Sequence, residues 1–130
     1  MTTTANICII IACVLPPFTA AIAKFKGVGV RRRDGGFDNH EPRAWLAKLG
    51  GYQARAVAAQ HNGFEALPLF IAGVLAAQQM HGDQSRIDML ALAFIAIRLV
   101  YAALYLANQA SLRSLVWAVG VACSIALFFV

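Results

Sequence analysis

With 130 residues, 60% hydrophobic content, only 13% charged residues and a mean hydropathy of +0.66, the chain is too apolar for an ordinary soluble domain. A membrane-spanning helix needs roughly 20 apolar residues, so one domain over residues 1–130 accommodates about four spans. The net charge of +5 comes from unevenly placed Lys and Arg residues, without the basic and aromatic interleaving that suits nucleic acid. The composition therefore predicts an all-α integral membrane domain, a four-transmembrane-helix bundle. Membrane lipid is the expected partner, and binding to nucleic acid is not expected.

The first span is predicted over residues 5–25, with Pro16 and Pro17 in its middle. Two successive prolines remove two backbone donors and predict a kink. The kink either serves helix packing or opens space for a ligand between helices. The three cysteines lie in the first and last apolar segments, where they are interpreted as small hydrophobic side chains and not as a disulfide framework.

Residues 27–51 form the only long polar stretch, which predicts a loop on the cytoplasmic side because short basic loops stay there. The run Arg31, Arg32, Arg33 is interpreted as a topological and lipid-headgroup anchor, with a substrate clamp as the alternative. Pro42 is expected to start a short interfacial helix that extends through Trp45.

The second span, predicted over residues 53–80, carries unusual polar side chains. At 100° per residue Arg55, Asn62 and Glu65 share one helical face, and His61 lies one turn before Glu65 at its edge. Ionisable groups in membrane helices face a bundle interior or a water-filled cavity, and they indicate a functional site. No metal site is expected.

The third and fourth spans are predicted over residues 87–107 and 112–130. Counting Lys and Arg in the connections places both termini outside the cytoplasm. At 1.5 Å per residue from the cytoplasmic ends of their helices, Glu65 and Arg98 both lie about 15 Å deep. Because an unpaired charge at this depth costs several kcal/mol, they are expected to form a buried ion pair.

These residues resemble the membrane-associated proteins in eicosanoid and glutathione metabolism, the MAPEG family, over the whole chain. The residues that match the motifs of its second, third and fourth helices are Arg55, Asn62, Glu65, Pro68, Arg98, Tyr105, Arg113 and Ser114. The resemblance is to a bacterial branch of the family. It implies a homotrimer of four-helix subunits in the bacterial inner membrane.

The resemblance also implies glutathione as the cofactor, bound near the cytoplasmic side between neighbouring subunits. Arg113 and Ser114 would be the catalytic pair that favours the glutathione thiolate. The expected cofactor-binding residues are His61, Asn62, Glu65, Arg98 and Tyr105. His61 stands where glutathione-using members have an arginine, and it is either a general base or a hydrogen-bonded structural group.

Two classes of function follow. In the first, the protein is an enzyme, a glutathione transferase or peroxidase that acts on lipophilic electrophiles dissolved in the membrane. In the second, it is a non-catalytic trimeric membrane scaffold or accessory subunit whose polar face is structural. The arginine missing before Asn62 favours the scaffold, whereas Tyr105 and the pair Arg113 and Ser114 favour the enzyme. A transporter is a third interpretation.

Overall fold

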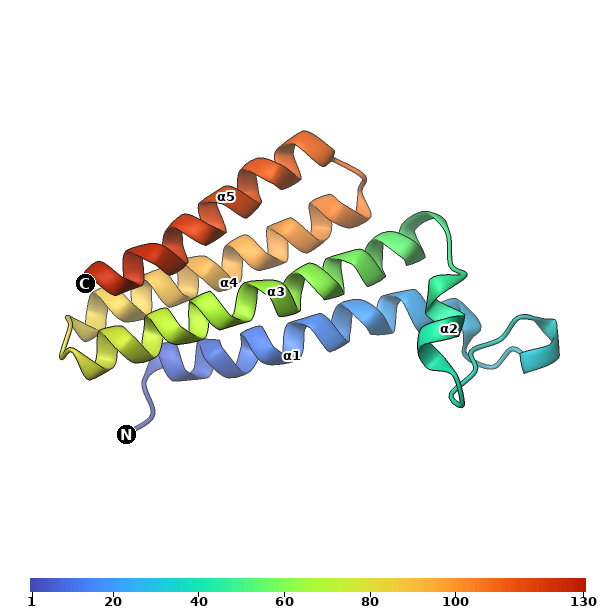
Figure 1. The fold of residues 1–130 in the computed structure, drawn as a ribbon, viewed down its shortest axis with the longest axis horizontal. Helices are drawn as coiled ribbons and strands as arrows, with labels where there is room; N and C mark the ends of the chain where they lie inside the picture. Colours follow the sequence, from blue (N-terminus) through green and yellow to red (C-terminus); the bar gives the residue numbers. More distant parts are fainter.

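The computed structural model describes all 130 residues and contains helices without any strand (Figure 1). The all-helical fold class is therefore confirmed. The four long helices, which cover the predicted spans, are α1 (Thr4–Lys24), α3 (Gly51–Gln79), α4 (Gln84–Leu106) and α5 (Ala110–Ala126). The short elements are α2 (Pro42–Ala47) and the 3-10 turns η1 (Phe25–Gly27), η2 (Arg32–Asp34) and η3 (Leu127–Phe129).

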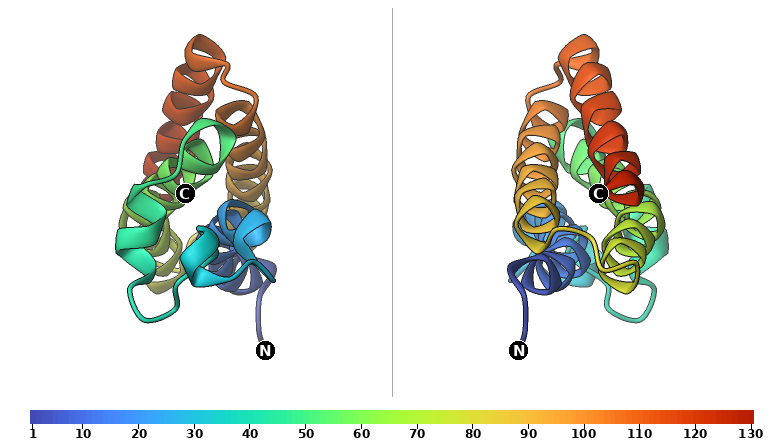
Figure 2. Two further views of the ribbon diagram at one scale, coloured as in Figure 1. Left: turned by 90° about the vertical axis from the view of Figure 1, so that its right-hand side faces the viewer. Right: turned by 90° about the vertical axis from the view of Figure 1, so that its left-hand side faces the viewer.

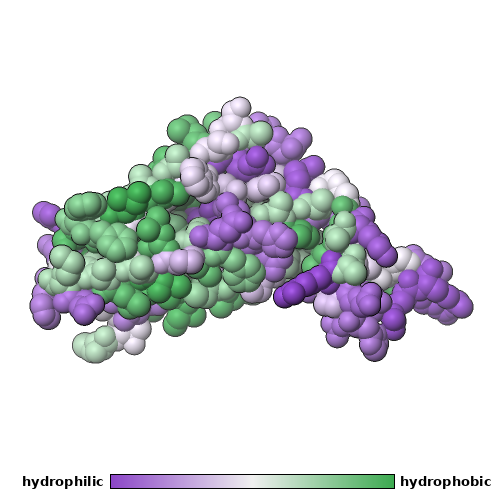
Figure 3. Space-filling model, viewed as in Figure 1, coloured by the Kyte–Doolittle hydropathy of each residue, from purple (hydrophilic) through white to green (hydrophobic).

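Three helical segments are long and apolar enough to cross a membrane: Thr4–Gly27, Gln84–Leu106 and Ala110–Phe129. The 29 residues of α3 are long enough as well, but α3 is not among these three segments. Its polar side chains lower its apolar content. On the face shown in Figure 3, apolar side chains gather over one part of the bundle, a hydrophilic band crosses its middle, and the folded loop at one end is hydrophilic.

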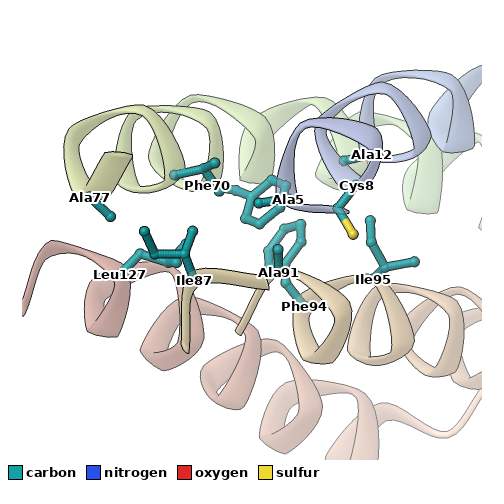
Figure 4. Packing of buried hydrophobic residues seen from close by; sticks show 11 residues of the cluster. Ala5, Cys8, Ala12, Phe70, Ala77, Ile87, Ala91, Phe94, Ile95 and Leu127 are labelled. Atoms are coloured by element: carbon teal, nitrogen blue, oxygen red, sulfur yellow. The ribbon is translucent and has the colours of Figure 1, made fainter. Parts of the chain in front are cut away.

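The core lies between α1, α3, α4 and the end of α5 (Figure 4). At its centre the rings of Phe70 and Phe94 stack with 4.0 Å between their centroids and 7° between their planes. Small side chains surround the stack and let the helices approach closely. The buried cluster consists of Ala5, Cys8, Ala12, Phe70, Val74, Ala77, Ile87, Ala91, Phe94, Ile95 and Leu127.

Hydrogen bonds to Asp88 on α4 and to the N-cap residue Thr3 fix the start of α1. The carboxylate of Asp88 on α4 accepts hydrogen bonds from the backbone N–H of Ala5, at 2.8 Å, and from Gln84 Nε2, at 2.7 Å. Thr3 Oγ1 accepts from the backbone N–H of Asn6. The Asp88 carboxylate and the Thr3 hydroxyl therefore accept hydrogen bonds from backbone N–H groups in the first turn of α1, which have no partner within the helix.

Pro16 and Pro17 lie inside α1, which is continuous from Thr4 to Lys24. Pro16 is buried and packs closely against α3, since a Cβ on Gly63 would lie 2.8 Å from Pro16 Cγ, whereas Pro17 is exposed. The cavity beside Pro16 has a volume of about 10 Å³, which is room for about one water molecule. The structure thus favours the packing interpretation of the two prolines.

The basic loop has a definite fold, which sequence patterns did not predict beyond the short helix. As expected, α2 begins at Pro42 and contains Trp45. Trp45 Nε1 donates to the Gly35 carbonyl at 3.1 Å, and its ring meets Phe37 edge to face at 5.3 Å. A Cβ on Gly27 would lie 2.6 Å from the Trp45 ring, so only glycine allows this contact.

Asp38 ties the loop together through its carboxylate. It accepts a hydrogen bond from the backbone N–H of His40 at 3.0 Å and forms an ion pair with Arg32 at 3.1 Å. The hydrogen bond from His40, followed by the nearby charge of Arg32, lowers the pKa of Asp38 below its usual value. The loop is consequently held in this form when Asp38 is ionised.

Candidate functional site

Two adjoining hollows lie between α3, α4 and α5, with volumes of about 300 Å³ and about 420 Å³. They share Asn62 and Trp117 and so form one depression, which we call the α3–α5 groove. Figure 2 shows α5 diverging from α3 towards the turn at residues 107–109, and the larger hollow is lined by Arg113 and Ser114 at this end of α5. The lining residues are Asn62, Glu65, Ala66, Leu69, Phe94, Arg98, Tyr101, Arg113, Ser114, Trp117, Ala118, Gly120, Val121 and Ser124.

Arg98 projects from α4 into the groove and lacks a charged partner. The residue is only 6% exposed, and its guanidinium makes neither a hydrogen bond nor an ion pair. The ring of Tyr101 has its centroid 4.2 Å from Arg98 Cζ. A guanidinium largely removed from water without a counter-ion is costly, so an anion in the groove would lower that cost.

The prediction of an ion pair between Glu65 and Arg98 is wrong for the single chain. The two ion pairs of the chain, Arg32 with Asp38 and Arg33 with Asp34, both lie in the loop. Glu65 is exposed and accepts a hydrogen bond of 3.4 Å from Asn62 Nδ2. Equal depth in the bundle does not bring two side chains together when one lies on an outer helical face and the other is buried.

Asn62 presents an unused acceptor. Its Oδ1 is buried and has no hydrogen-bond partner, whereas its Nδ2 donates to Glu65. Buried polar atoms in folded proteins are nearly always paired, because an unsatisfied group costs about 1–3 kcal/mol. Asn62 therefore keeps one buried acceptor without a partner beside the groove.

Aromatic rings connect the buried arginine to the groove's other arginine. Arg113 Cζ on α5 lies 4.1 Å from the Tyr105 ring centroid, and the rings of Tyr105 and Tyr101 meet edge to face at 5.7 Å. Arg113 and Tyr101 line the hollow of about 420 Å³, and Arg98 lines the hollow of about 300 Å³. The groove thus holds two guanidinium groups at different levels and one carboxylate, Glu65, at its edge.

Not every predicted site residue lies in the groove. Asn62, Glu65, Arg98, Arg113 and Ser114 line it, whereas Tyr105 contributes through Arg113. Ser114 Oγ donates to the Ala110 carbonyl of its own helix at 3.1 Å, which leaves the oxygen as an acceptor.

The structure separates two further polar residues of α3 from the groove. His61 is exposed and is not a lining residue. Arg55 Nε donates to the Leu106 carbonyl at 3.2 Å, so Arg55 satisfies a free acceptor at the end of α4. The role of Arg55 is consequently structural.

Sequence reasoning missed Tyr101 and Trp117 as members of the site. Tyr101 follows Arg98 by three positions and Trp117 follows Arg113 by four, so each lies on the helical face of the arginine before it. That spacing could have identified Tyr101 and Trp117 as neighbours of the two arginines. Both residues line the groove, and Trp117 belongs to both hollows.

A comparison with protein families gives one result that spans almost the whole chain. A sequence model of the MAPEG family matches residues 4–130. No curated protein and no solved structure matches the chain. Together with three apolar helices long enough to cross a bilayer, this match shows that the chain is an integral membrane protein that belongs to the MAPEG family.

Proposed function

We propose that the protein binds glutathione, or a closely similar anionic thiol, in the α3–α5 groove and transfers it to lipophilic electrophiles. The observation that carries the proposal is the buried guanidinium of Arg98, which faces a groove of ligand size without a counter-ion. Ligand pockets commonly have volumes of roughly 300–1,000 Å³, so both hollows fall in that range.

The chemistry of the lining residues fits such a ligand. One carboxylate of glutathione matches the guanidinium group of Arg98, and the guanidinium group of Arg113 remains for the thiolate. The ammonium and amide N–H groups of glutathione match Asn62 Oδ1 and the Glu65 carboxylate as acceptors. Leu69 and Trp117 supply apolar surface for a lipophilic second substrate.

The reaction needs a thiolate at neutral pH, whereas a free thiol has a pKa of about 8.5. Arg113 is the residue that would stabilise the thiolate, with Ser114 beside it at the mouth of the groove. The thiolate sulfur would then form a bond with an electrophilic carbon while the leaving group departs with its electron pair. With a peroxide as substrate, the sulfur would instead attack one peroxidic oxygen, the O–O bond would break with release of an alkoxide, and a second glutathione thiol would convert the resulting sulfenic acid into a disulfide and water.

We also propose that α3 is a fourth span and that three subunits assemble. Glu65 and Phe64 are exposed on α3, and a carboxylate facing lipid costs free energy that a neighbouring subunit would remove. The small residues Ala59 and Gly63 of α3 are used within the chain, because Ala59 is buried and Gly63 packs against Pro16. The proposed contact therefore uses the face of Glu65. The orientation follows from the basic loop, with both termini outside the cytoplasm of a bacterial inner membrane.

Calorimetric titration of the purified protein with glutathione tests this function, together with an assay for conjugation to an aromatic chloride in the same detergent. Saturable heat and conjugation are expected for the parent and for Arg86→Gln, which removes one exposed charge outside the groove. Arg98→Met should abolish the heat of binding. Absence of both signals from the folded parent would leave the scaffold as the function.

A further inference from the structure

The segment just past the end of α1 alternates apolar and basic side chains on the outside of the protein. Phe25, Val28 and Val30 are exposed by 80%, 70% and 44% respectively. Lys26 and Arg31 are exposed between and beside them. We call these five residues the basic lip. It lies where an apolar helix long enough to span a membrane ends.

The lip is held in place by backbone contacts. Phe37 N donates to the Gly27 carbonyl, and Gly36 N donates to the Arg31 carbonyl, each at 3.0 Å. A Cβ on Gly36 would lie 1.9 Å from the Val30 carbonyl oxygen, so the chain can cross here only at a glycine. A surface already ordered before binding loses less conformational entropy when a ligand arrives.

Most of the net charge of the protein is concentrated around this lip. Residues 24–48 contain seven Lys or Arg and three Asp or Glu residues, a net charge of +4 within a total of +5. Only Arg32 and Arg33 form ion pairs there, and Arg31 has no charged partner. Figure 3 shows this hydrophilic end beside the apolar surface of the bundle.

We propose that the basic lip is a binding surface for anionic phospholipid headgroups. Phe25, Val28 and Val30 enter the boundary of the hydrocarbon region, while Lys26 and Arg31 contact headgroup phosphates. The protein therefore prefers a negatively charged leaflet. This inference concerns a surface outside the α3–α5 groove and does not rest on glutathione binding.

Lipid fits the lip better than nucleic acid does. Single-stranded nucleic acid needs exposed aromatic rings on which bases stack. The rings of Phe37 and Trp45 pack against each other, and Lys24 Nζ lies 4.9 Å from the Phe37 ring centroid. The lip exposes one aromatic ring, Phe25, beside two valines, which suits an acyl-chain boundary and provides no second ring for stacking successive bases.

Native mass spectrometry of the full chain in mild detergent tests the proposal by counting retained lipids. Titrations would use dioleoyl phosphatidylglycerol and, separately, dioleoyl phosphatidylcholine. The parent should bind the anionic lipid more tightly. Arg31→Gln should reduce that preference about fivefold, because one basic residue near a charged surface contributes about 1 kcal/mol. Arg86→Gln, at the opposite end of the bundle, should leave it unchanged.

Equal effects of Arg31→Gln and Arg86→Gln, or equal binding of the two lipids by the parent, would overturn the proposal. Loss of phosphatidylglycerol binding on adding glycerol phosphate would assign the lip to a free phosphate compound instead. Tight binding of a single-stranded RNA that depends on Arg31 would assign it to nucleic acid. Unchanged melting of Arg31→Gln confirms that the variant is folded, as expected for a side chain without an ion pair.

Discussion

The guanidinium of Arg113 lies over the ring of Tyr105, with its central carbon 4.1 Å from the ring centroid. This contact links the first turns of α5 to the last turns of α4 across the short connection at residues 107–109. A cation above a ring face keeps its in-plane N–H donors free, and the Arg113 side chain makes no hydrogen bond. The tyrosine thus positions an arginine whose donors remain available at the groove.

Replacing Arg113 with Ala should weaken glutathione binding by about 1.5–3 kcal/mol, the usual contribution of a hydrogen bond to a charged group. Arg113→Lys should recover only part of this loss, because Lys keeps the charge but lacks the planar fork. Tyr105→Phe keeps the ring under the guanidinium and should have a smaller effect. Calorimetry measures all three. A larger loss for Tyr105→Phe than for Arg113→Ala would show that the ligand binds the tyrosine hydroxyl.

Arg98→Met should stabilise the ligand-free protein while abolishing ligand binding. The substitution removes a buried, unpaired charge. Replacing a buried ion pair by apolar residues often stabilises a protein by about 1–4 kcal/mol, and we take this value as the upper limit of the gain in unfolding free energy. Loss of the contact with the Tyr101 ring offsets about 0.5–2 kcal/mol of it. Thermal unfolding in detergent with and without glutathione measures both consequences.

Glu65→Gln is the matched control for Arg98→Met, because Glu65 forms no ion pair within the chain. This substitution should change the free energy of unfolding by less than about 0.5 kcal/mol. A loss of about 3–5 kcal/mol for Glu65→Gln would instead mean that Glu65 and Arg98 do pair.

Hydrophobic length and charge placement were enough to predict the helices, because both are local properties of the chain. The side-chain partners were not predictable in this way. Glu65 and Arg98 have matching depth, yet the rotation of each helix about its axis decides that one is exposed and the other buried. Arg55 was assigned to a polar site, but the end of α4 supplies its partner, the Leu106 carbonyl. Such contacts depend on packing between helices far apart in sequence.

Asp88→Ala should destabilise the protein by about 1–2 kcal/mol. The carboxylate accepts from Ala5 N and Gln84 Nε2, so its removal leaves a donor in the first turn of α1 without a partner. Asp88→Asn retains an acceptor oxygen and should cost less. Denaturation followed by circular dichroism compares the two variants. Equal stability of the Ala and Asn variants would show that the hydrogen bond to Ala5 contributes nothing.

Gly73→Ala should separate α3 from α5 and destabilise the bundle by about 1–3 kcal/mol, as overpacking usually does. A Cβ at this position would lie 2.8 Å from the Ser124 carbonyl oxygen and 3.0 Å from Leu127 Cβ. Backbone cannot move aside as a flexible side chain can. Gly50→Ala is the control, because nothing lies within 4 Å of its Cβ. The thermal midpoints of the two variants should differ, and identical midpoints would refute close packing at Gly73.

Reporter fusions test whether α3 crosses the membrane. Of the four long helices, α3 alone is not among the segments apolar enough to cross a membrane, because it carries polar side chains. If it spans, the basic loop before it and the turn at residues 80–83 lie on opposite sides. Alkaline phosphatase, active only outside the cytoplasm, should be active when fused after Gly82 and inactive when fused after Gly35.

Green fluorescent protein fused at the same two positions should give the reverse pattern, since it fluoresces only in the cytoplasm. The predicted orientation of α3 follows from the placement of basic residues. Residues 24–48 contain seven Lys or Arg residues, whereas the connection at the other end of α3 has only Arg86, in the first turn of α4. The same reporter signal at both positions would mean that α3 does not cross. It would then lie along the surface, and the α3–α5 groove would open to water and not to lipid.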